Sequence, residues 1–474
     1  MYCEPAGFGL RIIGFGMLNR GNMMLRLGFV VAMVASVGSV SAQNIDALYR
    51  QALLNDTQVI AARANARATN TLVTEGLSRL LPSLSLQGQA EVEYGRSDSG
   101  FPGLAQEGLT EWSANSALVL NQNLYNRQAW AGYESVQLLA RQSQTEVQAA
   151  EINLKRRVVD AFLDVLKAEQ NAQLSARVIA TVTRQLEQTQ ERFEVGLVAI
   201  TDVLEATATL DQAIADQVQA DNALILAQQE LARITGTQPQ PLPALSNTFD
   251  PTEVALDDLQ TWINRSRQNP ALVAQRQGID AAREERRASA GDLFPVLAAQ
   301  ARYGYGTSFI NDRPGTPGNP TPDDFSDRGT LTLALTATVQ LPLYDGGRRQ
   351  AGLDRAGYRI ESRMAQLDGQ TQQTELAIRQ LYQQLQADLS RLQALTQVVS
   401  SRTAAAQAIE LGYEVGSRNV VEVLNAQQAL LQAQTNLSNA RHDFLKRYIQ
   451  LREVAGVLSS ADLVWLTQQF NRES

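Results

Sequence analysis

The sequence lacks most of the residues from which enzyme sites are built. Its 474 residues include one cysteine and one histidine, and aromatic residues make up only 6%. Beyond residue 42 there is no thiol, no phosphate-binding loop and no His-Glu metal-binding spacing. We therefore expect no catalytic residue, no cofactor and no metal site. The single His442, which follows Arg441 and precedes Asp443 in a helical stretch, is expected to be a surface or interhelix residue.

Long apolar runs are also absent, except near the N-terminus. Residues 27–40 form an apolar stretch after Arg26, and small residues at 40–42 suit cleavage by signal peptidase. The run is too short, and too often interrupted by Gly and Ser, for a membrane-spanning helix. Residues 1–42 are predicted to be a secretory signal peptide, with Met23 or Met24 as alternative translation starts.

Excess positive charge is missing as well. The formal net charge is −8, and removal of residues 1–42 takes away three arginines and one glutamate, which leaves about −10. Since Cys3 is removed with the signal, the exported chain would have no disulfide, and packing alone would stabilise its fold. An acidic chain without a basic stripe is a poor ligand for nucleic acid, so we expect no nucleic-acid partner.

The chain is rich in Ala, Gln, Leu and Arg, a composition that favours long helices packed through small residues. Two stretches within it are similar, Arg192–Ala206 and Gly412–Ala426. In each, Glu-Val-Gly interrupts a long helical pattern and Val-Leu restarts it. Glycine can adopt the left-handed backbone conformation that closes a helix. Each stretch therefore predicts the tip of a helical hairpin, here called the first tip (193–203) and the second tip (413–424).

Polar residues follow both glycines and can cap the next helix. In the first tip we expect Thr201 or Asp202 to do so, and in the second tip Asn419 together with Glu422.

The similarity extends to whole units about 220 residues apart, which predicts a tandem duplication. The first repeat is assigned to residues 43–236 and the second to 253–456, joined by a linker at 237–252 and followed by a C-terminal segment at 457–474. Each repeat should contain a helix, two strands, a very long helix, a tip and a return helix. The first helices are predicted at 45–79 and 259–291, the strands at about 83–94, 112–125, 295–305 and 330–344, and exposed loops at 95–111 and 306–329.

Apolar and polar residues alternate along all four predicted strands, so each strand has one apolar and one polar face. In an exported protein such strands suit a membrane barrel with lipid outside and water inside. Aromatic residues at the helix-side ends fit a membrane interface: Tyr125, Trp130, Tyr133 and Tyr344. A soluble sandwich with one solvated face explains the alternation equally well, but four strands are few for a stable sandwich beside such long helices.

Four strands cannot close a membrane barrel, because each open edge would leave backbone groups unpaired in hydrocarbon. The chain must therefore assemble if its sheet lies in a membrane. Three copies would supply twelve strands and a barrel wide enough for a lumen, whereas two copies would supply eight strands and a barrel filled by its own side chains.

The two tips closely resemble the coiled-coil tips of the TolC family of outer-membrane channel-tunnel proteins. The resemblance covers the whole chain after residue 42 and includes Leu-Pro-Ser-Leu at 81–84 and Ala-Asp-Leu at 461–463. It implies a mainly α fold with β: a homotrimer whose twelve-stranded outer-membrane β-barrel, four strands per protomer, continues into a long periplasmic α-helical coiled-coil barrel. The linker 237–252 and the segment 457–474 would then lie in the equatorial region of the helical part.

The same resemblance implies an exit duct for tripartite efflux pumps, for type I protein secretion, or for both. The implied partners are a periplasmic adaptor protein, an inner-membrane transporter of the RND, ABC or MFS type, and outer-membrane lipid. The alternative is that the chain is itself a periplasmic adaptor, since adaptors also use long helical hairpins. Adaptors carry one hairpin inserted into compact β-rich domains, however, whereas this chain has two hairpins with matched strand pairs.

The family's periplasmic gate is closed by links between hairpins of neighbouring protomers. Carried over by motif, the gate residues would be Tyr413 and Arg418 on the inner hairpin, with Thr201 and Asp202 on the outer one. Without the motif, a helix cap for Asp202 and a solvated turn position for Arg418 are the simpler interpretations.

Two further sets of residues are implied by the motif. Where the family can place two acidic rings three residues apart, this chain has Glu422 and Asn425, so the second ring would be neutral and block by polyvalent cations weaker. Adaptor docking is expected at the hairpin tips, at Gly196, Leu197, Val198, Gly416 and Ser417.

Overall fold

The computed structural model describes residues 44–95, 109–238, 242, 254, 256–311 and 325–470. The predicted signal peptide and most of the predicted linker 237–252 lie outside these residues. The described chain is mainly helical with one four-stranded sheet, as the sequence predicts. In these ranges, no helix combines the length and the apolar character that crossing a membrane would require.

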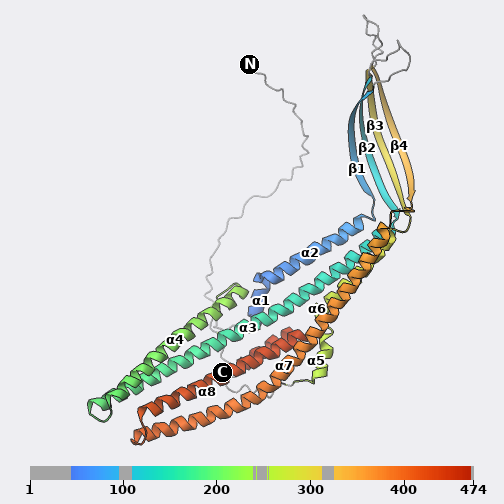
Figure 1. Ribbon diagram of the computed structural model, residues 1–474. Helices are drawn as coiled ribbons and strands as arrows, with labels where there is room; N and C mark the ends of the chain where they lie inside the picture. The colour runs from blue at the N-terminus through green and yellow to red at the C-terminus, as the bar shows by residue number, and fades with distance from the viewer. Residues whose placement is uncertain are drawn as a thin grey trace, which may run out of the picture. The chain divides into compact units, whose positions relative to one another are not determined.

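The same order of elements occurs twice along the chain (Figure 1). The first series is α1 (Ile45–Asn55), α2 (Thr57–Ser78), β1 (Ser83–Gly95), β2 (Leu109–Tyr125), α3 (Arg127–Glu194) and α4 (Ile200–Thr235). The second is α5 (Leu259–Ser266), α6 (Pro270–Gly291), β3 (Val296–Asn311), β4 (Phe325–Gln340), α7 (Arg348–Glu414) and α8 (Val420–Val454), followed by α9 (Ser460–Phe470).

The helix predicted as continuous over 45–79 is broken at Asp56, between α1 and α2. The Asp56 carboxylate accepts a hydrogen bond from the Val59 N–H at 3.0 Å, which caps α2. The same carboxylate forms two hydrogen bonds with the Arg157 guanidinium of α3, at 2.7 and 2.9 Å. These bonds are the main cause that holds the pKa of Asp56 below its usual value. The continuous prediction was wrong because the groups that stabilise the break come from another helix.

The helix predicted over 259–291 is also broken, between α5 and α6. Asn269 caps α6 by accepting a hydrogen bond from the Ala271 N–H at 2.9 Å. Pro270 is the first residue of α6, where the missing N–H costs nothing, but inside a helix it would remove a hydrogen bond and clash with the preceding turn. The two repeats therefore share a break at the same place, formed by different residues.

Each break packs against the end of the return helix of its own repeat. Asn55 Nδ2 donates to the carbonyl that precedes Gly236 at 2.8 Å, and Asn269 Nδ2 donates to the carbonyl two residues before Gly456 at 2.9 Å. Both glycines have positive φ, 76° and 73°, and a Cβ on either would lie 2.7 Å or less from the asparagine. We call each of these contacts an Asn–Gly clasp.

The sheet is antiparallel throughout, in the order β1-β2-β3-β4, so the repeats join between β2 and β3. Its register aligns apolar residues across all four strands. One such row is Leu86, Leu118, Tyr303 and Leu333. Strands β1 and β4 each have only one neighbour within the sheet, so two strand edges remain unpaired in the described chain (Figure 1).

The strands extend further into the predicted loops than expected. Residues 306–311 and 325–329 were predicted as loop, but the β3–β4 ladder continues to the pair Asn311–Phe325. Ladder pairing uses backbone groups, so Gly and Ser do not end it where the alternating pattern stops. In the other direction β4 ends at Gln340 rather than at 344, before Pro342, which has no N–H to donate.

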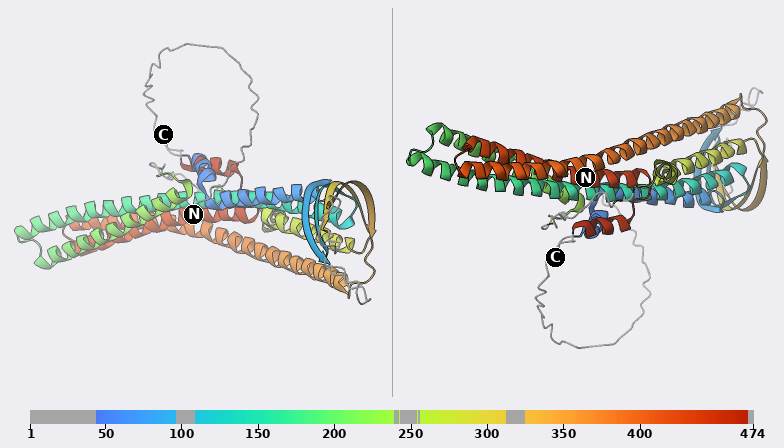
Figure 2. Two further views of the ribbon diagram at one scale, coloured as in Figure 1. Left: turned by 90° about the horizontal axis from the view of Figure 1, so that it is seen from above. Right: turned by 90° about the horizontal axis from the view of Figure 1, so that it is seen from below.

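The main core lies where the short helices α1, α5 and α9 pack against the middle parts of α3, α7 and α8. Trp262, Phe162 and Phe444 are fully buried there, and the Phe162 ring meets Phe470 edge-on at 5.3 Å. From this core the pairs α3/α4 and α7/α8 run side by side to their tips in both views of Figure 2.

Candidate functional site

The first tip turns as the sequence predicts. Gly196 closes α3 with φ of +75°, its N–H donates to the Phe193 carbonyl at 2.9 Å, and the Leu197 N–H donates to the Arg192 carbonyl at 2.9 Å. This pair of bonds is the Schellman arrangement, in which a left-handed residue lets two amides satisfy the last carbonyls of a helix.

The second tip has the same turn. Gly416 closes α7 with φ of +77°, its N–H donates to the Tyr413 carbonyl at 3.1 Å, and the Ser417 N–H donates to the Gly412 carbonyl at 2.8 Å. The Ser417 hydroxyl also donates to that carbonyl, at 3.0 Å. Both tips are therefore rigid turns in which glycine is required by backbone conformation.

Of the predicted caps, Asn419 is confirmed, whereas the Glu422 side chain pairs with Arg418 and the first tip has no side-chain cap. Asn419 caps α8 by accepting a hydrogen bond from the Glu422 N–H at 2.8 Å. In the first tip the capping position is Ala199, which has no side-chain acceptor, so neither Thr201 nor Asp202 caps α4. The helix starts at Ile200, two residues earlier than a Thr201 cap requires and three earlier than an Asp202 cap requires, and both side chains lie in its first turn.

Tyr413 is almost fully buried, at 5% exposure, in an apolar cluster that joins the two hairpins near their tips. The Arg192 guanidinium lies 4.2 Å from the centre of its ring, a cation–π contact across the hairpins. The Tyr413 hydroxyl has no hydrogen-bond partner among the described residues. Sequence reasoning missed Arg192, although it is the first residue of the motif that defines the tip.

The four predicted gate residues do not bond to one another within one chain. In the described residues, no hydrogen bond or ion pair links Tyr413 or Arg418 to Thr201 or Asp202. Arg418 instead forms an ion pair with Glu422, one turn along, at 3.5 Å with both side chains solvent-accessible. Two residues to which the motif gives separate roles, gate and pore ring, are therefore partners here.

Glu422 and Asn425 lie three residues apart on α8 and so share one face of that helix. Only the first carries a charge.

The predicted docking residues are exposed, apart from Val198, which is half-buried. Leu197 is 74% exposed and Val195 beside it 70%, so the first tip ends in apolar side chains. The second tip presents Gly416, Ser417 and Arg418 to solvent, together with the apolar Val415.

The sheet carries a second candidate surface. Its apolar rows face outward uncovered by any described element, with Leu86, Leu333 and Leu335 each more than 70% exposed. At the helix-side end, Tyr125, Trp130 and Tyr344 are also exposed. A continuous apolar sheet face of this extent is unusual on a protein surrounded by water, and it marks a lipid or protein contact.

Nothing in the described residues forms a group of acidic, His or Cys side chains that could hold a metal ion. His442 is an interhelix residue, one of the two positions expected for it, and it is 1% exposed.

Comparison with known proteins gives a consistent result. The model of the family described as outer membrane efflux protein matches residues 48–237 and 263–457. The outer membrane protein TolC of Vibrio cholerae is 31% identical over 92% of this chain and 96% of its own length. The alkaline protease secretion protein AprF of Pseudomonas aeruginosa is 27% identical over 89% of this chain and 86% of its own.

Solved structures have the same fold. The outer membrane protein VceC of Vibrio cholerae superimposes with a TM-score of 0.71 at 18% identity, covering 87% of this chain and 96% of that one. CusC, described with a transmembrane channel, gives a TM-score of 0.71 at 16% identity, covering 87% and 92%. The predicted fold class is thereby confirmed.

Proposed function

The chain belongs to the outer membrane efflux protein family, and on that premise we propose that it is the outer-membrane exit duct of tripartite efflux pumps, of type I protein secretion, or of both. Proteins of this family are outer-membrane channels rather than enzymes, with the helical part in the periplasm. Relatives named for efflux and for protease secretion support both kinds of cargo. Nothing in the comparisons supports the alternative of a periplasmic adaptor.

The observation that carries this proposal is the sheet. It exposes an apolar face and leaves the edges of β1 and β4 unpaired in the described chain. Unpaired edges cannot lie in hydrocarbon, so other copies must complete the barrel. Family channels form trimers, and three copies give twelve strands around a lumen.

Two neighbouring residues of β4 test the lipid-facing assignment. Leu333 is near the middle of the strand on the apolar face, and Thr332 points to the opposite face. Leu333→Arg should destabilise the membrane-inserted protein by about 2–4 kcal/mol, whereas Thr332→Arg, facing the lumen, should cost much less. The measurement is folding into lipid vesicles in urea. Equal costs for both variants would contradict a membrane barrel.

The oligomer and the pore are tested on protein purified from membranes. A trimer by mass that conducts ions in planar bilayers is expected. A stable single-copy species without conductance would rule the proposal out.

For the gate, we propose that Tyr413 and Arg418 of one protomer pair with Thr201 and Asp202 of a neighbour. Two observations support this: the Tyr413 hydroxyl is buried without a partner and would gain a hydrogen bond, and the weak, solvated Arg418–Glu422 pair can exchange to a new partner at little cost. Each exposed pair is worth up to ~1 kcal/mol, repeated around the trimer. Tyr413→Phe combined with Arg418→Ser should raise single-channel conductance; unchanged conductance would remove both residues from the gate.

For the pore ring, we propose that Glu422 faces the lumen as a single acidic ring, with Asn425 neutral beside it. Polyvalent cations should block weakly, and Asn425→Asp should strengthen the block by adding a second ring. Weaker block in that variant would contradict the assignment.

For the partners, we propose a periplasmic adaptor at the tips and an inner-membrane transporter of the RND, ABC or MFS type behind it. The exposed Leu197 and the rigid turns at Gly196 and Gly416 support docking there. We also propose that residues 1–42 are cleaved, and that 237–252 and 457–474 lie in the equatorial region. Deleting the gene and measuring drug sensitivity together with secreted proteins distinguishes the two kinds of cargo.

A further inference from the structure

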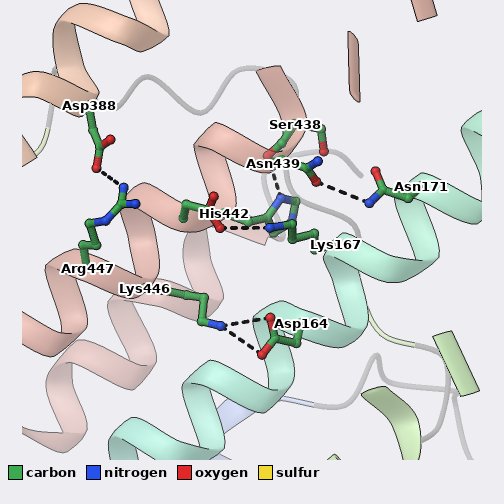
Figure 3. Close-up of polar contacts among 10 residues, drawn as sticks. Asp164, Lys167, Asn171, Asp388, Ser438, Asn439, His442, Lys446 and Arg447 are labelled. Atoms are coloured by element: carbon green, nitrogen blue, oxygen red, sulfur yellow. Dashed lines mark hydrogen bonds and ion pairs between the residues drawn. The ribbon is translucent and has the colours of Figure 1, made fainter. Parts of the chain in front are cut away.

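A polar contact surface joins α3 to α8 at the tip-side end of the main core, where its residues alternate with core residues such as Leu166 and Phe444 (Figure 3). We call it the α3–α8 seam and define it by Asp164, Lys167, Gln170 and Asn171 of α3 with Ser438, Asn439, His442, Asp443 and Lys446 of α8.

Cross-helix hydrogen bonds and ion pairs hold the seam together. Lys446 bonds both carboxylate oxygens of Asp164 at 2.9 Å, and Lys167 bonds Asp443 at 3.0 Å. The remaining pairs are Asn171 with Asn439 at 3.3 Å and Ser438 with Gln170 at 2.5 Å. From α7, Asp388 pairs with Arg447 just beyond the seam (Figure 3).

His442 is the buried member of this set. Its Nδ1 lies 2.9 Å from the Ser438 carbonyl oxygen, which can only accept, so Nδ1 carries the proton of the neutral ring. Nε2 is buried and has no partner among the described residues. A second proton would therefore bind to Nε2 and create a buried, positively charged ring whose new N–H has no hydrogen-bond acceptor, which costs free energy.

The charged groups around His442 give a mixed field. Burial is the main cause that lowers the pKa of His442 below its ordinary value, and the positive charge of Lys167 lowers this pKa further. The Ser438 carbonyl and the carboxylates of Asp443 and Asp164 raise the pKa and oppose that shift. The packed seam thus favours the neutral form of the imidazole.

We propose that His442 is an acid-sensitive latch: when it is protonated, the polar contacts of the seam are lost while the apolar core around Phe444 still holds α8, and the tip-side part of the α7/α8 hairpin is freed to move. This inference rests on the proposed function, because the moving tip is the one that carries Tyr413 and Arg418.

The geometry explains why the seam would control the tip. Leu424 and its neighbours attach α8 to the α3/α4 hairpin at the tip, and the seam attaches it again from Ser438 onward, about 21 Å away at 1.5 Å per residue. Between the two attachments the hairpins enclose a cavity of about 570 Å³ lined by α3, α4, α7 and α8. If the seam is lost, the apolar cluster at the tips is the attachment that remains between α8 and the α3/α4 hairpin on the tip side of the main core.

The direction of the pH effect follows from the lowered pKa. Once the seam opens, water reaches the ring and its pKa returns toward about 6.5. Above that pH neither state binds the extra proton, and the seam keeps its full stability. Below it the released state binds a proton that the packed state does not, so the equilibrium shifts toward release by at most ~10-fold per pH unit.

Other buried acids act in the opposite direction. Burial raises the pKa values of Asp160, Glu169 and Glu453. These carboxylates therefore bind protons more readily when they are packed than when they are exposed, so lower pH favours their packed state. Asp56 and Glu230 have lowered pKa values and weaken the fold only at more acidic pH, near and below about 4. Loosening between about pH 6.5 and 5.5 is therefore attributable to His442.

The chain contains one histidine, which makes the test direct. Protein prepared without a histidine tag and labelled at histidine gives one imidazole resonance, and its titration should fall well below the ordinary value. In planar bilayers the open population of the wild type should be up to ~10-fold higher at about pH 5.5 than at about pH 7.5.

Two variants separate the latch from a packing role. His442→Asn keeps an N–H donor for the Ser438 carbonyl but cannot titrate, so its open population should change much less with pH. Lys167→Gln removes a neighbouring cation that lowers the pKa of packed His442, so the pH response should still begin near pH 6.5 but should be smaller than in the wild type. If His442→Asn does not fold, His442→Gln serves the same purpose.

A histidine resonance that titrates at or above its ordinary pKa, or equal pH profiles for wild type and His442→Asn, would overturn the latch. Should the protein form no pore at any pH, the proposed function fails, but the latch is still decided by unfolding. Wild-type stability should then fall from about pH 7.5 to about 5.5 relative to His442→Asn, and a constant difference would reject it.

Discussion

The return helices α4 and α8 derive from the same unit of sequence but lie in different surroundings. Leu204 and Leu424 hold matching positions after the tip glycines, yet Leu204 is 62% exposed and Leu424 only 4%. Further along, Val218 and Ile225 of α4 are exposed, whereas Phe444 and Ile449 of α8 are in the core. Helix α8 packs between α7 and α3, and α4 has an uncovered apolar face. An uncovered face in one copy of a duplicated element indicates a surface for another chain.

The tips differ in chemistry although their turns are the same. In the first tip the capping position is Ala199 and the exposed residues are apolar; in the second it is Asn419, and Arg418 replaces a valine. Gly412 makes room for that arginine, because a Cβ there would lie 2.7 Å from Arg418 Cγ. The second tip therefore carries polar groups suited to reversible bonds, and the first carries an apolar end suited to a stable contact.

The largest expected effect tests the difference in burial. Leu424→Ala should reduce the free energy of unfolding by about 2–5 kcal/mol, whereas Leu204→Ala should change it by less than about 0.5 kcal/mol in a chain whose α4 face is uncovered. Chemical denaturation of the detergent-solubilised protein gives both values. Comparable losses would mean that assembly buries α4 as fully as the fold buries α8.

The second-largest expected effect tests whether the two tips depend equally on a glycine with positive φ. Gly196→Ala and Gly416→Ala should each cost about 1–2 kcal/mol, because alanine is strained at positive φ and neither site has a neighbour that a Cβ would touch. Asparagine, which tolerates this conformation better, should recover part of the loss at both positions. Unequal costs would show that one turn is not held in the conformation seen here.

The caps offer a way to exchange one property between the tips. Asn419→Ala should destabilise α8 by about 1 kcal/mol, and Ala199→Asn should stabilise α4 by a similar amount or less. Hydrogen exchange of the first-turn amides measures each change locally. If Ala199→Asn left the α4 amides unchanged, the backbone there could not place a side chain for capping.

The smallest effect concerns the Arg418–Glu422 pair. Both side chains are solvent-accessible, so Glu422→Gln should change stability by about 0.5 kcal/mol or less, and added salt should remove the difference. Thermal unfolding at low and high salt is the measurement. A large loss that salt does not affect would mean that Glu422 has a role in packing.

The type and order of the elements could be predicted, because long periodic stretches and the repeated tip motif are strong local signals. The breaks at Asp56 and Asn269 were missed, although Asn-Pro at 269–270 is a local turn signal. The bonds that fix Asp56 come from Arg157, about a hundred residues away, and no periodicity contains them.

The site residues could be predicted only from the family motif, and the burial and contacts of their side chains could not be predicted from the sequence. The burial of His442, the contact of Arg192 with Tyr413 and the pairing of Arg418 with Glu422 depend on how the hairpins pack. The missing cap at Ala199 depends on a helix start two or three residues earlier than expected. Such differences are within the usual uncertainty of helix boundaries assigned from sequence, but they decide which side chain caps the helix.

The Asn–Gly clasps have a consequence for the origin of the chain. Each clasp joins the helix break near the beginning of a repeat to the end of the return helix of the same repeat, so each repeat closes into a loop of its own, although the main core is built from both repeats. A gene for a single repeat would already encode a closed two-stranded unit, and six copies of it would supply the same twelve strands as three copies of the present chain. Fusion of two such genes would then have allowed the halves to diverge, one toward a buried return helix and the other toward an exposed one.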